Sequence, residues 1–175
     1  MSPMDRKIVF ILGGARSGKS AFALKEASKI SGKKAYIATA ESLDEEMRQR
    51  IEEHKRKRGD DWVTYEEPLK IVDLVKKMKS EYNVILIDCL TLWLSNLMHN
   101  NLDIRHEIEN LVSTLRITHH ASYIVSNEVG MGIVPDNKMA RDFRDLAGFL
   151  NQKIAEIADE VYLVTAGIPV KIKGK

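Results

Sequence analysis

The residues with the clearest chemical role form a short run where a predicted strand gives way to a predicted helix, within ILGGARSGKSAFAL (11–24). They match the pattern G-x-x-x-x-G-K-[ST], and in this chain they are Gly13, Gly14, Ala15, Arg16, Ser17, Gly18, Lys19 and Ser20. Glycine loses more conformational entropy on folding than other residues, so a cluster at this junction indicates that a ligand approaches the main chain closely. In this pattern main-chain N–H groups surround nucleotide phosphates, and the helix dipole adds to the attraction. We therefore predict a triphosphate site rather than an ordinary glycine-rich turn.

Three side chains are expected to act on the nucleotide and its metal ion. Lys19 would contact the β- and γ-phosphates, and the Ser20 hydroxyl would ligate Mg²⁺. A second metal ligand is expected at Asp88, which ends the apolar run 84–87. Many strands end in an aspartate at a simple turn, but beside a triphosphate site we favour Asp88 as a direct or water-mediated ligand. Together the motifs predict an NTP·Mg²⁺ site and leave the reaction open.

The elements that must position these residues alternate between short apolar runs and longer amphipathic stretches, which indicates an α/β fold. Strands are expected at 8–12, 35–38, 62–65, 84–87, 122–126 and 161–165. Several are continuously apolar, as parallel strands covered by helices on both faces are. Helices are expected at 19–30, 43–58, 69–79, 90–98, 104–119 and 138–158. In such a sheet the loops that follow the strands gather at the carboxyl edge, where ligands bind.

Length and composition indicate one soluble domain over residues 1–175. The chain is 44% hydrophobic and 30% charged, which suffices for a single core. Its formal net charge of +2 gives no reason to expect nucleic acid or an anionic membrane as the main partner. The single cysteine, Cys89, excludes an internal disulfide and a cysteine-based zinc site and favours a reducing compartment. The apolar run 8–12 is too short for a signal peptide or a membrane span, so we expect a cytoplasmic protein without an integral membrane segment.

The predicted helix 43–58 carries a histidine on its apolar face. Met47, Ile51 and His54 are spaced i, i+4, i+7 and so share one side of the helix. His54 is either a half-buried histidine satisfied by a neighbour, which spacing alone favours, or a nucleophile or acid–base group, since imidazole is reactive near neutral pH. The basic run after it is either a solvated helix end or a cover for the triphosphate, and consists of Lys55, Arg56, Lys57 and Arg58.

A third loop, SNEVGMGIVP (126–135), follows another apolar strand and so lies on the same edge of the sheet. It is either a plain connection or, as we favour, a mobile substrate-binding loop that uses Asn127, Glu128, Gly130 and Gly132. The helix after it carries Arg141 and Asp145 at i, i+4, which by default form an exposed ion pair of little energetic value.

Several segments together carry a more specific resemblance. The chain resembles the bifunctional adenosylcobinamide kinase/adenosylcobinamide-phosphate guanylyltransferase family of cobalamin biosynthesis. The resemblance runs in order from about Ile8 to Lys173 through GGARSGKS, YIATA, EMRQRIEEHKRKRGDDW, DCLTLWLSNL, SNEVGMGIVPDNKMARDFRDLAGFLNQKIAEIADEVYLV and AGIPVKIK. It implies two reactions: ATP or GTP phosphorylates adenosylcobinamide, and GTP then transfers GMP to that phosphate through a GMP-histidine intermediate. His54 is the only histidine in the matching segment.

The resemblance also implies the architecture and the contacts. It implies a RecA-like P-loop fold with a mostly parallel sheet, and a homotrimer with active sites near the subunit interfaces. Beyond the P-loop, it places nucleotide contacts at Ala38, Thr39, Ala40, His54, Lys55, Arg56, Lys57, Glu66 and Asp88. Two alternatives stay open: a kinase that retained only the first reaction, and a RecA-like regulatory ATPase. The second would require an extended basic surface or an added module, and neither is evident in 175 residues at net +2.

Overall fold

The computed structural model describes residues 6–41, 49, 59–78 and 81–175. Its central feature is a seven-stranded sheet in the order β3-β2-β4-β5-β1-β6-β7. All neighbours pair in parallel except β6 and β7, which are antiparallel. The strands are β1 (Ile8–Gly13), β2 (Lys34–Ala38), β3 (Trp62–Glu66), β4 (Val84–Asp88), β5 (Ala121–Asn127), β6 (Glu160–Thr165) and β7 (Ile168–Lys173).

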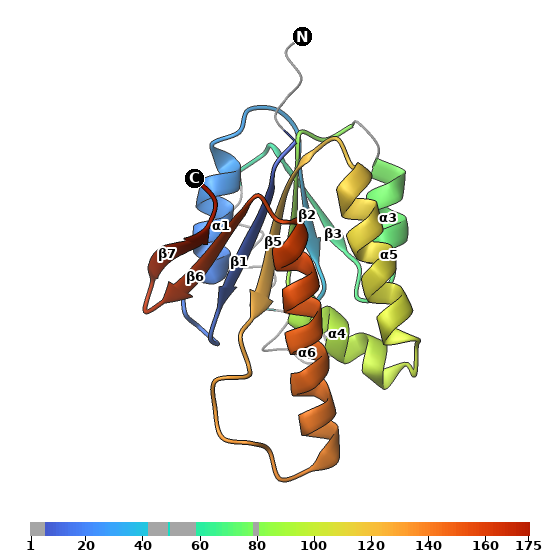
Figure 1. Cartoon of the computed structure of the whole chain (residues 1–175). Coiled ribbons are helices and arrows are strands. Elements are labelled where there is room, and N and C mark those ends of the chain that lie inside the picture. Colours follow the sequence, from blue (N-terminus) through green and yellow to red (C-terminus); the bar gives the residue numbers. More distant parts are fainter. Residues whose placement is uncertain (1–5, 42–48, 50–58, 79–80) are drawn as a thin grey trace.

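Helices cover both faces of this sheet (Figure 1). They are α1 (Lys19–Ser28), α3 (Ile71–Met78), α4 (Leu90–His99), α5 (Ile104–Ile117) and α6 (Lys138–Ile157). Alternate residues of β1 enter two separate cores: Val9 and Ile11 pack toward α1, whereas Phe10 packs with the other four helices. Strands buried on both faces must be apolar at successive positions, which is why β1, β2 and β4 read as continuous apolar runs. The predicted α/β fold is confirmed.

All six predicted strands are present. The predicted helices 19–30, 69–79, 90–98, 104–119 and 138–158 correspond to α1, α3, α4, α5 and α6 with ends shifted by up to two residues. The helix α3 starts at Ile71, and the two residues before it, Leu69 and Lys70, donate their N–H groups to the Glu67 carboxylate. The predicted helix 43–58 lies outside the described residues.

The strand β7 was not predicted. It follows β6 through a two-residue turn in which Ala166 and Gly167 have φ angles of 51° and 78°. Tight hairpin turns of type I′ require positive φ at both central residues. The signals for this strand were the glycine and the alternating residues IPVKIK.

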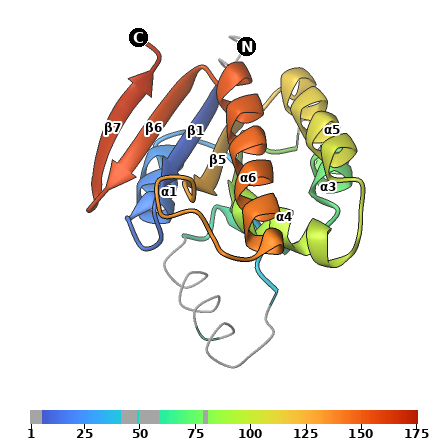
Figure 2. The ribbon, with the colours of Figure 1, turned by 60° about the horizontal axis from the view of Figure 1, so that its bottom comes forward.

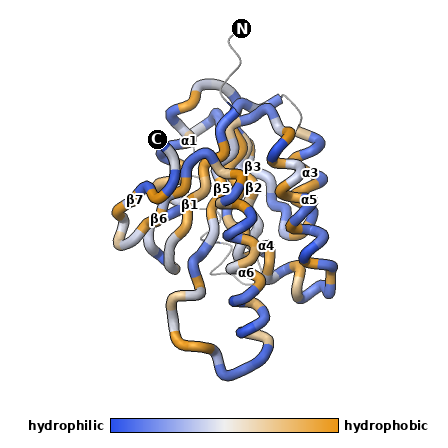
Figure 3. The backbone as a smooth tube through the Cα atoms, in the orientation of Figure 1, coloured by the Kyte–Doolittle hydropathy of each residue, from blue (hydrophilic) through white to orange (hydrophobic). Residues whose placement is uncertain are grey.

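The loops that follow β1, β4 and β5 open at one end of the sheet, which Figure 2 turns toward the viewer. The longest of these, between β5 and α6, includes an apolar segment that Figure 3 shows at the lower left. Its side chains are exposed at Met131, Ile133 and Val134, by 79%, 96% and 60%. No helix among the described residues is long and apolar enough to cross a membrane.

Candidate functional site

The phosphate-binding loop joins the end of β1 to the start of α1. Gly18 stands at the helix N-cap with φ of 96° and offers no side-chain cap, so the first N–H groups of α1 are free of a capping side chain. A Cβ at Gly13 would lie 2.4 Å from the Val164 carbonyl oxygen and 2.5 Å from Ser17 Oγ. The motif glycines therefore meet two requirements of this fold: a left-handed residue at the helix start and close packing of β1 on β6.

Lys19 is held within the loop. It is 7% exposed, and its Nζ donates a 2.6 Å hydrogen bond to the carbonyl oxygen of Gly14. Burial lowers the pKa of Lys19, while electrostatic interactions with Cys89 and Asp88 oppose this shift. The lysine thus lies close enough to Asp88 for their charges to interact, although Lys19 begins α1 and Asp88 ends β4. A phosphate oxygen is a stronger acceptor for this ammonium group than the Gly14 carbonyl.

Asp88 ends β4 at the same edge of the sheet. Its Oδ2 accepts a 2.7 Å hydrogen bond from the Tyr36 hydroxyl, which fixes the carboxylate in one orientation. The neighbouring Cys89 is buried, and burial, followed by the charge of Asp88, raises the pKa of its thiol to about 11. Within the described part of the chain, no cluster of three or more His, Cys, Asp or Glu side chains could hold a metal ion. A metal held by Asp88 would therefore need further oxygen ligands, such as the Ser20 hydroxyl and a nucleotide.

The segment after β2 is bound tightly to the segment after β4. Thr39 is fully buried, and its Oγ1 both donates to the Cys89 carbonyl at 2.7 Å and accepts from the Cys89 N–H at 2.8 Å. The Asn96 amide donates to the carbonyl of Thr39 at 2.9 Å. Among the predicted nucleotide contacts, Ala38 and Glu66 are paired across β2 and β3. The hydroxyl of Thr39 is thus used by the protein, whereas the next residue, Ala40, is only half-buried.

A polar network that sequence reasoning missed holds the end of β5. The Asn127 N–H donates to Thr91 Oγ1 at 2.6 Å, and the Asn127 carbonyl accepts from Asn151 Nδ2 at 3.1 Å. Ser126 Oγ donates to Asn151 Oδ1 at 2.8 Å. Thr91, Ser126 and Asn151 are at most 7% exposed. The strand register places Asn127 beside Gly13, so this network fixes the predicted substrate loop next to the phosphate loop.

The rest of the predicted substrate loop starts from this anchor. The Glu128 N–H donates to the Gly13 carbonyl at 3.0 Å, and the Glu128 carboxylate accepts from the Gly130 N–H at 2.6 Å. Gly132 has open space around its Cα. The expected ion pair between Arg141 and Asp145 is wrong. Arg141 instead donates to the main-chain carbonyls of Pro135 and Asp136, and so holds the end of this loop against α6.

The unpredicted hairpin of β6 and β7 also supports the phosphate loop. The Gly167 N–H donates to the Ser17 carbonyl at 2.8 Å, and a Cβ at Gly18 would lie 3.2 Å from the Gly167 Cα. Ser17 Oγ is buried and has no hydrogen-bond partner in the described part of the protein. An unsatisfied buried hydroxyl in a nucleotide loop is the kind of group that a phosphate would satisfy.

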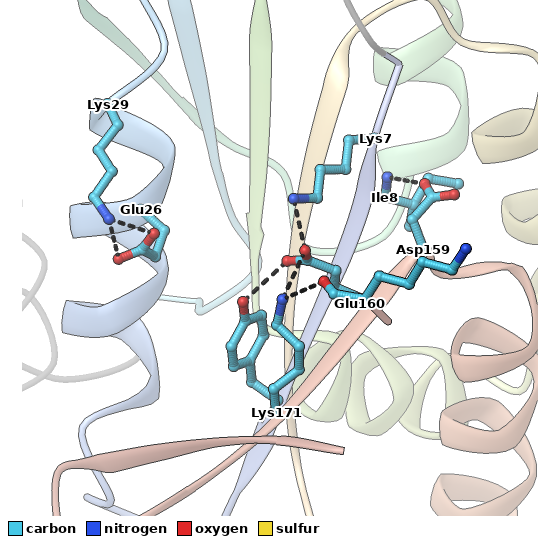
Figure 4. A network of polar contacts seen from close by, with 9 residues as sticks. Lys7, Ile8, Glu26, Lys29, Asp159, Glu160 and Lys171 are labelled. Carbon is cyan, nitrogen blue, oxygen red and sulfur yellow. Dashed lines mark hydrogen bonds and ion pairs between the residues drawn. The ribbon is translucent and has the colours of Figure 1, made fainter. Parts of the chain in front are cut away.

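A charged cluster fixes the other end of this hairpin (Figure 4). The Glu160 carboxylate accepts hydrogen bonds from Lys7 and Lys171 at 2.9 Å each and from the Tyr162 hydroxyl at 3.0 Å. Burial raises the pKa of Glu160, but these three donors outweigh it and lower the pKa to about 2. The adjacent Asp159 accepts from the Ile8 N–H at 2.7 Å. The hairpin is therefore fastened to the start of β1 at one end and to the phosphate loop at the other.

The structure thus brings together most of the predicted site. The ends of β1, β2, β4 and β5 carry the P-loop residues, the segment 38–40, Asp88 and Asn127 at one edge of the sheet. The predicted nucleophile and basic run, His54 and Lys55 to Lys57, lie outside the described residues, so their roles stay predictions.

Comparison with solved structures assigns the chain to one architectural class. The flagellar accessory protein FlaH from Methanocaldococcus jannaschii aligns with a TM-score of 0.55 at 10% identity, over 97% of this chain and 79% of that one. The RadB recombinase aligns with a TM-score of 0.53 at 14% identity, over 90% and 73%. At these identities the likeness shows the fold alone, which is that of RecA-like P-loop proteins.

Sequence comparison is more specific. A protein of Pseudomonas aeruginosa named bifunctional adenosylcobalamin biosynthesis protein CobP is 41% identical over 169 residues, covering 94% of this chain and 96% of the relative. The Escherichia coli K12 protein named bifunctional adenosylcobalamin biosynthesis protein CobU is 38% identical over 184 residues, covering 95% and 99%. The profile of the family described as cobinamide kinase / cobinamide phosphate guanyltransferase matches residues 9–172. The chain therefore belongs to the cobinamide kinase / cobinamide phosphate guanyltransferase family.

Proposed function

We propose that this chain is a bifunctional transferase that carries out both reactions of its family. It phosphorylates the hydroxyl of the aminopropanol arm of adenosylcobinamide with ATP or GTP. It then transfers GMP from GTP to that phosphate, and the products are adenosylcobinamide-GDP and pyrophosphate. The observation that carries this proposal is the family match over residues 9–172, which includes the complete phosphate loop and Asp88.

The first reaction requires positioning and neutralisation of charge more than acid–base chemistry. The substrate hydroxyl oxygen bonds to the γ-phosphorus, the bond from that phosphorus to the β–γ bridging oxygen breaks, and the hydroxyl proton passes to water. Lys19 would leave the Gly14 carbonyl, 2.6 Å away, to contact the β- and γ-phosphates. The buried Ser17 hydroxyl and the N–H groups at the start of α1 would complete the phosphate cradle.

The residues at this edge fit Mg²⁺. The Ser20 hydroxyl and the Asp88 carboxylate are hard oxygen donors, which this ion prefers, and the hydrogen bond from Tyr36 orients Asp88 in advance. When bound there, Mg²⁺ would neutralise charge on the phosphates. We expect Asp88→Asn to raise the Mg²⁺ concentration needed for half-maximal activity. An unchanged metal requirement would count against Asp88 as a ligand.

The second reaction would use His54 as nucleophile. A ring nitrogen of His54 bonds to the α-phosphorus of GTP, the bond to the α–β bridging oxygen breaks, and pyrophosphate leaves. A phosphate oxygen of adenosylcobinamide phosphate then attacks the same phosphorus and frees the histidine. Two displacements through a phosphoramidate are ordinary covalent catalysis. Lys55, Arg56 and Lys57 are proposed to neutralise the triphosphate during this step, with Ala38, Thr39, Ala40 and Glu66 as further nucleotide contacts.

The test is incubation with α-labelled GTP, followed by denaturing electrophoresis and acid treatment. We expect label that stays with the wild-type chain and is lost in acid, as a phosphoramidate requires. His54→Asn should stop labelling while phosphorylation of adenosylcobinamide continues, because the first reaction needs no imidazole. Lys19→Ala should abolish both reactions with the fold intact. Labelled His54→Asn protein would place the covalent step on another residue.

Two further results would change the proposal. Phosphorylation without any labelling would identify a kinase that retained only the first reaction. Nucleotide hydrolysis without phosphorylation would favour the regulatory ATPase. We further propose a cytoplasmic homotrimer that does not bind nucleic acid, which sedimentation analysis and a nucleic-acid binding assay would test.

A further inference from the structure

The outer face of α4 lies between two hollows that are separate from the phosphate loop. One hollow, of about 340 Å³, lies between α4 and the start of α6 and is lined by apolar groups that include Met98, Met139 and Phe143. The other, of about 300 Å³, lies between α4 and the segment after β2 and includes Leu92. Ser95 lines both hollows, as does His99. The two hollows therefore adjoin along Ser95 and His99, and together we call them the α4 cleft.

We propose that the α4 cleft binds the corrin ring of adenosylcobinamide, so that the aminopropanol arm reaches the phosphate edge. This inference rests on the proposed function, because it assigns a place to the substrate of that function. The corrin ring is a large macrocycle with methyl groups on its periphery and amide arms around it. A site for it needs apolar contact area together with hydrogen-bonding groups.

The lining of the α4 cleft has this mixed character. Met139 is 68% exposed and Leu92 is 39% exposed, and exposed apolar side chains that line a hollow are typical of a ligand or partner site. Methionine side chains are flexible and polarizable and adapt to irregular ligands. The cleft also presents Ser95, Asn100 and the His99 ring, which can bond amide groups. His99 Nδ1 is 2.7 Å from the Ser95 carbonyl and therefore donates to it, so that Nε2 is the ring nitrogen that could bond a ligand amide.

The position of the cleft suits a substrate that must reach the phosphates. The helix α4 begins directly after Asp88 and Cys89, and Ser95 lies six residues beyond Cys89, about 9 Å along a helix. The other wall begins at Ala40, next to Thr39, which bonds twice to Cys89. Both walls are thus joined to the segment that carries the proposed metal ligand.

Hydrogen bonds also hold α4 against the neighbouring loops. Asn96, which lines the cleft, donates from its amide to the carbonyls of Thr39 and Pro68 at 2.9 and 3.0 Å. These bonds fasten α4 to the loops after β2 and β3. A cleft with fixed walls loses little entropy when it binds a rigid macrocycle.

A larger hollow, of about 620 Å³, fits the requirement less well. It lies beyond the end of α4, where Asn101 and Leu102 line it, and it includes the charged side chains of Arg105, Asp142 and Asp145. It meets the α4 cleft at Met98, but Asn101 and Leu102 follow the end of α4, so it extends away from the phosphate edge. It supplies a matched control, because Leu102 is 43% exposed and Leu92 is 39% exposed.

The experiment compares Leu92→Asp with Leu102→Asp. Binding of adenosylcobinamide is measured by equilibrium dialysis in the dark without nucleotide, and GTP affinity and thermal melting are measured for each variant. We expect Leu92→Asp to weaken adenosylcobinamide binding at least tenfold, with GTP affinity within twofold of wild type. Leu102→Asp should bind both ligands as wild type does. Ser95→Trp, which fills the cleft without adding charge, should weaken adenosylcobinamide binding to a similar degree.

Wild-type adenosylcobinamide affinity in Leu92→Asp and Ser95→Trp would overturn the assignment of the cleft. An equal loss in Leu102→Asp would overturn it as well, because the effect would then not be local. These results leave the proposed function standing as long as wild-type protein phosphorylates adenosylcobinamide. If the wild-type protein neither binds nor phosphorylates it, the proposed function and the cleft both fail.

Discussion

The Thr91 hydroxyl accepts a 2.6 Å hydrogen bond from the main-chain N–H of Asn127, although the two residues come from different elements, α4 and β5. Because Asn127 pairs with Gly13 in the sheet, this bond ties the first turn of α4 to the edge that holds the phosphates. Thr91 is 7% exposed, so water does not replace it as an acceptor. We regard Thr91 as a positioning residue.

We expect Thr91→Val to lower kcat by about 10- to 100-fold with little change in the KM for nucleotide, because small displacements of reacting groups cost rate. The loss of a buried acceptor should also lower the free energy of unfolding by about 1–3 kcal/mol. Thr91→Ser keeps the hydroxyl and should restore most of kcat. If Thr91→Ser is as slow as Thr91→Val, restoring the hydroxyl does not restore kcat, and the role assigned to this hydrogen bond is wrong.

The turn of the β6–β7 hairpin offers a test of support for the phosphate loop. Gly167 has φ of 78° and donates to the Ser17 carbonyl. Gly167→Ala should cost about 1 kcal/mol of backbone strain and raise the KM for ATP or GTP roughly fivefold. The control is Gly148→Ala within α6, where a Cβ meets no atom within 4 Å. That change should stabilise the protein by about 0.5–1 kcal/mol and leave KM unchanged. Equal effects of both changes on KM would contradict the role of the hairpin.

The Glu160 cluster predicts a specific dependence of stability on pH. The pKa of Glu160 is lowered to about 2 from an ordinary 4.5, so its stabilising contribution is complete above pH 4.5 and is lost as pH falls toward 2. We expect Glu160→Gln to lower the free energy of unfolding by about 1 kcal/mol at pH 7, since its partners are partly exposed.

This difference should persist at pH 5 and shrink between pH 4.5 and 2, as thermal melting in a pH series would record. The matched control is Glu26→Gln, which removes the i, i+3 pair with Lys29 that Figure 4 also shows. An effect of that control as large as the effect of Glu160→Gln would indicate that general surface charge, and not the cluster, determines stability.

The single cysteine reports on opening of the site. The pKa of Cys89 is raised to about 11, so only about one thiol in a thousand is ionised at pH 8, compared with about one in ten for an ordinary thiol of pKa 9.0. We expect native protein to react with iodoacetamide at least 100-fold more slowly than urea-unfolded protein, with a rate that rises between pH 8 and 10. Fast labelling of native protein at pH 8 would show that the segment after Asp88 opens readily.

Most of this fold could be predicted from the sequence alone, because strands buried on both faces appear in it as uninterrupted apolar runs. Runs such as 84–87 are apolar at every position, and the phosphate-loop pattern fixes its own place between a strand and a helix. Asp88 and Asn127 followed from this, since parallel strands bring their carboxyl ends to one edge.

The supports of the site could not be predicted in the same way. Thr91 and Asn151 lie in helices where a polar residue is usually solvated, and only the packing of α4 and α6 on β5 reveals their bonds to Asn127. The expected Arg141–Asp145 ion pair was wrong for a similar reason. The Arg141 guanidinium donates instead to two main-chain carbonyls, whose positions the fold determines. Spacing shows which residues share a helix face but not which distant partners the fold supplies.

The central place of β1 has a consequence for synthesis of the protein. This strand lies between β5 and β6, and its first residue, Ile8, bonds to Asp159, which is 151 positions later in the chain. At about 5–20 residues per second, a ribosome needs roughly 8–30 s to make the intervening chain. Throughout this time the apolar strand β1 lacks at least one of its two neighbours, because β5 is made before β6. The nucleotide site therefore forms late in translation, and a pause between α6 and β6 would expose β1 to aggregation.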